Sequence, residues 1–142
     1  MKLQLFSVMV IMLLAGCATS PISSGSARDV PPERIFLIEK LAEEGNSRAI
    51  FIRDVGLTGS GVHQHLFIDG KKVASLDTGE KIEFILIPGE HIFGVIPTDL
   101  FGYHALNTID QDLKPGKKYF YRLVTDGNSM RTFIQRTIPD MK

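Results

Sequence analysis

Cysteine is nearly absent from this sequence, and tryptophan is missing altogether. Among 142 residues the single cysteine is Cys17. One cysteine cannot form a disulfide within the chain, so a folded domain must be held together by its hydrophobic core, even in an oxidising compartment.

An excess of charge of either sign is also lacking. The chain has 16 basic and 16 acidic side chains, and loss of Lys2 with residues 1–16 would leave 15 against 16, a net charge of −1. A nearly neutral domain has no basic surface for phosphate backbones, so the composition argues against nucleic acid as a partner. Apolar residues make up 44% and charged residues 23%, which is typical of one globular domain.

Only one long hydrophobic run precedes Cys17, and it begins directly after Lys2. The run Leu3 to Leu14 contains two polar residues and is otherwise apolar. A helix of about a dozen residues spans roughly 18 Å, which is short of the ~30 Å hydrocarbon core of a bilayer. We therefore expect residues 1–16 to be a cleaved signal peptide and not a membrane span.

Small residues separate this run from the cysteine, in the order Leu14-Ala15-Gly16-Cys17. The tetrapeptide resembles the lipobox of bacterial lipoproteins. The resemblance implies that the cysteine sulfur receives a diacylglycerol, that cleavage precedes Cys17, and that the new amine is acylated. Two or three such chains anchor a protein stably in a bilayer. Ala18 stands where a retention signal would carry Asp, which, by similarity to the enterobacterial sorting rule, favours the periplasmic face of the outer membrane.

Two segments follow the lipobox. Residues 17–31 are predicted to be the lipidated cysteine and a flexible tether, because the stretch is rich in serine and has no periodicity. The folded domain is expected over residues 32–142. It should begin with a short amphipathic helix over Glu33–Glu44, where apolar residues recur every three to four positions. A strand at Arg34–Ile38 is the alternative, because Ile-Phe-Leu-Ile also favours β structure.

Short apolar runs separated by turn residues fill the rest of the chain. Asp69-Gly70 and residues 126–128 are hairpin signals, and Pro88-Gly89 and Pro115-Gly116 suit type II turns. This spacing predicts a mostly β fold, a single antiparallel β-sandwich of about seven to eight short strands. The run Ile82–Ile87 is apolar on both faces, so it is the best candidate for a central strand. The expected strands are Ala49–Arg53, Val62–Ile68, Lys72–Leu76, Ile82–Ile87, His91–Ile96, Ala105–Gln111, Lys118–Thr125 and Met130–Ile138.

Two motifs in this region resemble a known family. From Phe67 the chain reads FIDGKKVASLDTGEKIEFILIPGEHIFGV, which is similar to PEGA-type surface domains and, more closely, to bacterial lipoproteins with domain of unknown function 2846. Members also have a lipobox and a later segment like PGKKYFYR at Pro115–Arg122. The resemblance covers Arg48 to about Val124 and departs from the family at Ala74-Ser75 and in the helix-like segment ahead of the first strand. It implies a small β-domain of unknown activity.

Two histidines, His63 and His65, are weak candidates for metal ligands. On a strand their side chains share one face, and with His91 or His104 they could supply three nitrogen ligands to zinc or copper. No carboxylate lies beside them at ligand spacing, so a surface pair next to a buried face is the main interpretation. No cofactor is predicted, and a metal or small-ligand carrier is the alternative function.

Ser60 lies in the glycine-rich run Gly56–Gly61 and is close in sequence to His63. Nucleophilic catalysis by a hydrolase needs a Ser or Cys held by a base. The run lacks the strand–turn–helix context of a nucleophile elbow and the ending of a phosphate loop. A flexible connection explains it more simply, and we predict no enzyme.

Aromatic residues in the connection Pro97–His104 suggest a binding surface. Phe101, Tyr103 and His104 follow an expected strand, and aromatic residues on long loops often mark interfaces. Core packing of Phe101 is the alternative. The sequence thus predicts a lipid-anchored, non-enzymatic periplasmic module that binds an envelope protein or cell-wall component through this loop and Asp54–Gly61.

Overall fold

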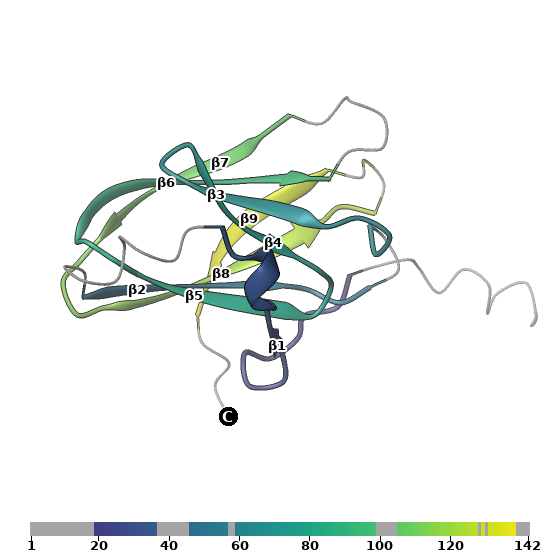
Figure 1. Cartoon of the computed structure of the whole chain (residues 1–142), viewed down its shortest axis with the longest axis horizontal. Helices are drawn as coiled ribbons and strands as arrows, with labels where there is room; N and C mark the ends of the chain where they lie inside the picture. Colours follow the sequence, from purple (N-terminus) through teal and green to yellow (C-terminus); the bar gives the residue numbers. More distant parts are fainter. Residues whose placement is uncertain are drawn as a thin grey trace, which may run out of the picture.

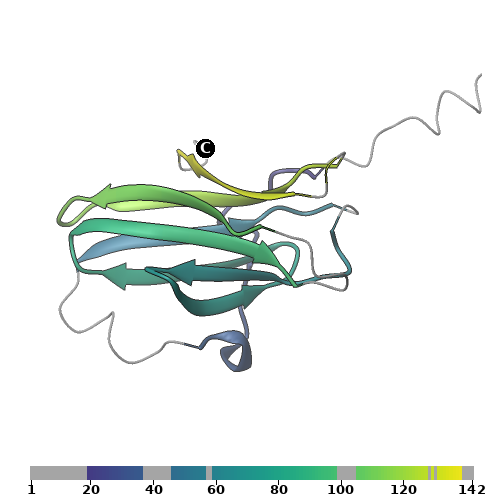
Figure 2. The same ribbon diagram turned by 90° about the horizontal axis from the view of Figure 1, so that it is seen from above.

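The computed structural model describes residues 19–36, 46–56, 59–98, 105–127, 129 and 131–138. Within these ranges the chain forms two β-sheets that pack face to face (Figures 1 and 2). The described ranges contain no helix that is long and apolar enough to cross a membrane. The strands are β1 (Arg28–Asp29), β2 (Ser47–Arg53), β3 (Gln64–Ile68), β4 (Lys71–Leu76), β5 (Glu80–Leu86), β6 (Gly89–Pro97), β7 (Asn107–Leu113), β8 (Lys118–Thr125) and β9 (Thr132–Thr137).

The predicted β-sandwich is confirmed, and the eight expected strands correspond to β2 to β9. In β3 the alternation is that of a half-buried strand, with Gln64, Leu66 and Ile68 buried and the residues between them partly exposed. The expected hairpin at Asp69-Gly70 is also present. Both residues have positive φ, 51° and 76°, as a two-residue turn of this kind requires.

The five-stranded sheet is mixed, so the prediction of purely antiparallel pairing is wrong for it. Its order is β1-β5-β2-β8-β9, and both β2–β8 and β1–β5 are parallel. The four-stranded sheet, β4-β3-β6-β7, is antiparallel throughout. Turn residues predict only the pairing of strands that a hairpin joins. They carry no information about β2 and β8, which are distant in sequence.

An aromatic cluster fills the space between the sheets. The ring of Phe51 stacks on Tyr121 with centroids 5.0 Å apart, and it meets the ring of Phe93 edge-on at 5.0 Å. Phe84 makes a second edge contact with the ring of Phe51, at 6.4 Å. Each fully buried aromatic side chain contributes about 1.5–3 kcal/mol of hydrophobic stabilisation. This cluster therefore stabilises a domain that has no disulfide.

Residues 20–31 are part of the folded domain, which corrects the prediction of a flexible tether there. Strand β1 pairs with β5, and Ala27 and Val30 are buried. Together with Ile22, Ala27 packs on the outer face of the five-stranded sheet against Ile50, Ile52 and Phe120. The sequence did not predict that this segment is folded, because it is rich in serine and only a few apolar residues make the contact.

The expected helix over Glu33–Glu44 is wrong for its first residues. A single 3-10 turn spans Pro32–Arg34, and Ile35 is extended, with φ −107° and ψ 117°. Ile35 then pairs with Ala74 of β4, and the amide of Phe36 donates to the carbonyl of Val73 at 2.8 Å. The open edge of β4 offers backbone hydrogen-bond partners to an extended chain, and these contacts are not visible in the local sequence pattern. Residues 37–44 lie outside the described residues.

The strand that is covered on both faces is β2, not the predicted run Ile82–Ile87. Strand β5 buries one face but exposes Glu83 and Ile85 on the other. In β2, six of seven residues are buried, because the N-terminal segment covers its outward-facing Ile50 and Ile52. The prediction of the central strand was wrong because it did not include the packing of residues 22–27 on β2.

Strands β2, β6 and β8 finish at the same end of the sandwich, which we call the loop end. Strand β2 runs parallel to β8, and Pro97 at the end of β6 lies opposite Gln64, whose amide reaches Thr125 of β8 at 2.8 Å. In Figure 1 the loop end is on the right. The turns at Asp69-Gly70 and Lys114–Lys117 lie at the opposite end, since β3 and β7 run toward it.

Candidate functional site

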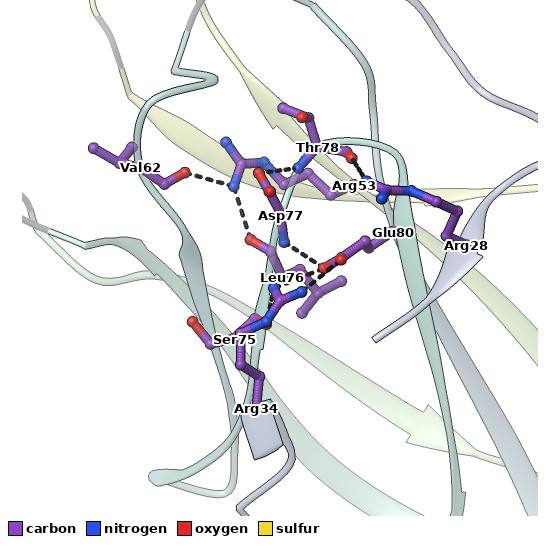
Figure 3. A network of polar contacts seen from close by, with 9 residues as sticks. All are labelled: Arg28, Arg34, Arg53, Val62, Ser75, Leu76, Asp77, Thr78 and Glu80. Atoms are coloured by element: carbon purple, nitrogen blue, oxygen red, sulfur yellow. Dashed lines mark hydrogen bonds and ion pairs between the residues drawn. The ribbon is translucent and has the colours of Figure 1, made fainter. Parts of the chain in front are cut away.

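The loop end is organised around Arg53, the last residue of β2, whose side chain is 2% exposed. Its guanidinium donates to the backbone carbonyls of Val62 and Leu76 through Nη1, at 2.7 and 2.8 Å, and to that of Gly59 through Nη2, at 2.6 Å. Burial lowers the pKa of Arg53 to about 10, which still leaves it charged near neutral pH. One buried cation therefore holds the loop after β2 to the start of the β4–β5 turn (Figure 3).

Glu80 supplies the buried negative charge of the same region. Its carboxylate accepts two hydrogen bonds from Arg34, at 2.8 and 2.6 Å, and one from the amide of Asp77 at 2.7 Å. The hydrogen bond to Glu80 is the main reason that the pKa of Arg34 is raised. Arg34 also donates to the carbonyl of Ser75 at 3.1 Å, so the pair ties the N-terminal segment to β4 and β5 (Figure 3).

A second ion pair lies on the outer face of the five-stranded sheet. Arg122 of β8 binds the buried carboxylate of Asp54 at 2.5 Å and the carbonyl of Ile22 at 3.1 Å. This arrangement connects β8, the first residue after β2 and the N-terminal segment. Charge-assisted bonds of this kind are stronger than neutral ones and favour a fixed geometry.

The two candidate metal-binding histidines lie near each other, but the structure gives His65 other partners. Its Nδ1 is 3.0 Å from the hydroxyl of Ser75, and its Nε2 is 3.3 Å from that of Thr98. His63 is exposed just before β3. Among the described residues, no group of three or more His, Cys, Asp and Glu side chains is placed to hold a metal ion.

His91, proposed as a third ligand, lies toward the opposite end of the sandwich. It is six residues from Pro97 along β6, or about 20 Å at the rise of an extended strand. Its ring nitrogens face Asp69 and the carbonyl of Ile87, each at 2.8 Å, so it secures the β3–β4 turn. The combination of His63 and His65 with His91 is therefore wrong, and His104 lies outside the described residues.

The two loops predicted to bind a partner are both at the loop end. This holds for their described parts, which are Asp54–Gly56, Gly59–Gly61 and residues 97–98; Phe101, Tyr103 and His104 lie outside the described residues, as does Cys17. A cavity of about 450 Å³ opens here between β6 and β9, and its lining includes Pro97, Leu106 and Phe133. Ser60 lies in the exposed turn at this end, shortly before His63.

Sequence reasoning missed the contacts of Arg53, Arg34 and Arg122. A charged residue at the end of an apolar strand, as Arg53 is after Ala49–Ile52, was the available signal. The partners of Arg53, Arg34 and Arg122 are distant in sequence or are backbone carbonyls. No spacing rule identifies such contacts.

Comparison of the chain with protein-family models, with curated proteins and with solved structures finds no match in any of the three. The resemblance to domain of unknown function 2846 stays a prediction that rests on the motifs. The geometry of the loop end and the lipobox-like tetrapeptide are thus the physical basis for a functional proposal.

Acidification is expected to destabilise the domain through His65. Burial first, then the charges of Lys72 and His63, lowers the pKa of His65. The unfolded chain therefore binds a proton at this ring before the folded protein does, and the free energy of unfolding falls as the pH drops below the ordinary histidine range of about 6.5. Urea unfolding at neutral and mildly acidic pH should show a smaller fall for His65→Gln than for the wild type.

His63→Gln is the control for that titration, because the exposed ring of His63 influences His65 only as a secondary charge. This variant should keep most of the pH dependence. An equal fall for His65→Gln, His63→Gln and the wild type would contradict the assignment to His65.

Proposed function

We propose that the mature chain is a lipid-anchored, non-enzymatic binding or structural module of the bacterial cell envelope. The observation that carries the proposal is the tetrapeptide Leu14-Ala15-Gly16-Cys17, which follows a short apolar run and directly precedes a β-sandwich. In this proposal Cys17 carries a diacylglycerol and an acylated amine. The domain then lies at the periplasmic face of the outer membrane.

The loop end supports binding over catalysis because its buried charges are engaged in holding the backbone. Arg53 uses its guanidinium on three carbonyls, and Glu80 accepts from Arg34 and from a turn amide. Asp54 is paired with Arg122. Such contacts stabilise loops in one shape, which lowers the entropic cost of binding a partner.

The surface that best suits a partner is the pair of loops Asp54–Gly61 and Pro97–His104 with the cavity beside them. Leu106 is 46% exposed at this cavity, and Arg131 adds a cation. Exposed apolar and arginine side chains are typical of protein interfaces. We propose an envelope protein or a cell-wall component as the partner, with no cofactor.

Replacement of the proposed lipid-bearing residue tests the anchor. In cells, Cys17→Ser should abolish lipid attachment and remove the chain from the outer-membrane fraction, since the acyl chains supply the membrane affinity. Membrane fractionation and mass spectrometry of the N-terminal peptide measure both effects. Thr19→Ser keeps the tetrapeptide and should behave as the wild type. A Cys17→Ser chain that stays in the outer-membrane fraction would refute the proposed anchor.

Crosslinking in intact cells tests the binding role. The double variant Phe101→Ala/Tyr103→Ala should reduce recovery of a crosslinked envelope partner by about tenfold or more, as expected when an aromatic hot spot of an interface is removed. Lys117→Ala, at the opposite end of the sandwich, should leave recovery unchanged. Thermal unfolding of the variants provides a check of the fold. Unchanged recovery from a folded double variant would count against this surface.

A further inference from the structure

The N-terminal segment enters the folded domain at the loop end. Ser20 forms a two-bond bridge with Val55, its amide donating at 2.6 Å and its carbonyl accepting at 3.1 Å. Val55 lies two residues after β2, beside Asp54. The next contact, from Arg122 to the carbonyl of Ile22, secures the same place. The purple N-terminal residues in Figure 2 lie alongside the loop end.

From this point the segment is bound along the sandwich. Lys81 donates to the carbonyl of Ser24 at 2.8 Å, and the amides of Arg28 and Val30 donate to β5 and its preceding turn, both at 3.0 Å. The Arg34–Glu80 pair follows at 2.6 Å. Residues 20–36 are therefore held by backbone bonds, ion pairs and buried apolar contacts, and they do not act as a spacer.

We propose that the loop end faces the phospholipid headgroups of the bilayer. This inference rests on the proposed lipid at Cys17. Two residues, Ala18 and Thr19, lie between Cys17 and Ser20, and the three Cα–Cα steps that join them span about 10 Å when extended. A seven-residue strand such as β2 is about 23 Å long. The link is too short for the opposite end, with Lys114–Lys117, to turn toward the membrane.

A free tether would not impose this orientation. Thirteen flexible residues have an average reach of about 20 Å and can extend further, so any face of the domain could meet the bilayer. Docking of residues 20–36 shortens the free link to the few residues before Ser20. A protein partner of the loop end must then itself lie at the membrane surface, while the Asp69-Gly70 and Lys114–Lys117 turns face the periplasm.

Single labels at the two ends test the orientation. Gly61→Cys places a thiol at the loop end, where an added Cβ meets no atom within 4 Å, and Lys117→Cys places one in the exposed turn at the opposite end. The mature lipidated chains, labelled with an environment-sensitive fluorophore, are reconstituted in vesicles of phosphatidylethanolamine and phosphatidylglycerol. Lipids with nitroxide headgroups should quench the Gly61→Cys label several-fold more than the Lys117→Cys label. Equal quenching, or stronger quenching at position 117, would overturn the orientation.

An insertion provides the matched control. About a dozen Gly and Ser residues between Ala18 and Thr19 should lengthen the free link and make quenching at the two ends similar. A difference that survives the insertion would show that the short link is not its cause and would overturn the inference.

Flotation separates the two proposals. If the mature chain isolated from cells carries an unmodified Cys17 and does not float with the vesicles, the lipid anchor is refuted, and the orientation with it. A chain that floats but shows equal quenching at both ends would refute the orientation alone.

Discussion

Glu80 is a buried carboxylate at the point where β4, β5 and the N-terminal segment meet, and a charge in this position is costly unless it is paired. Arg34 binds it with two hydrogen bonds, and the amide of Asp77 adds a third. The negative charge of Glu80 also opposes the lowering of the pKa of Arg53 by burial. Removal of Arg34 would leave the buried Glu80 carboxylate without its ion-pair partner. The pair fixes residues 32–36 of the N-terminal segment against β4 and β5.

The same segment completes the sandwich. It covers the edge of β5 through β1 and meets the edge of β4 through Ile35, so it shields two sheet edges that would otherwise offer unpaired backbone groups. It also covers Ile50 and Ile52 on the outer face of β2. Attachment to the membrane and completion of the fold are thus functions of one stretch of chain in the proposed account.

Local chemistry predicted most of the fold. Alternation in β3 and the turn residues at Asp69-Gly70 and Pro115-Gly116 were sufficient to place the strands, because these features depend on neighbouring residues alone. The errors concern contacts between distant residues. The extended conformation of Ile35 depends on β4, and the burial of β2 on residues 22–27, so neither can be predicted from local patterns.

The candidate site was predicted less completely than the fold. The described parts of both proposed binding loops lie at the loop end, yet the buried Arg53 and the Arg34–Glu80 pair that shape it were missed. The shape of this region depends on contacts of charged side chains with groups that are distant in sequence. The predicted combination of His63 with His91 was wrong because β6 carries His91 away from the loop end.

Native-state hydrogen exchange is the most direct measurement of the central claim, that the segment before β2 is an integral part of the domain. The amides of Arg28, Val30 and Phe36, which donate to backbone carbonyls, should exchange as slowly as typical sheet amides, and Arg34→Met should accelerate them selectively. Exchange of these amides at the rate of an unfolded chain, with β2 still protected, would contradict the account.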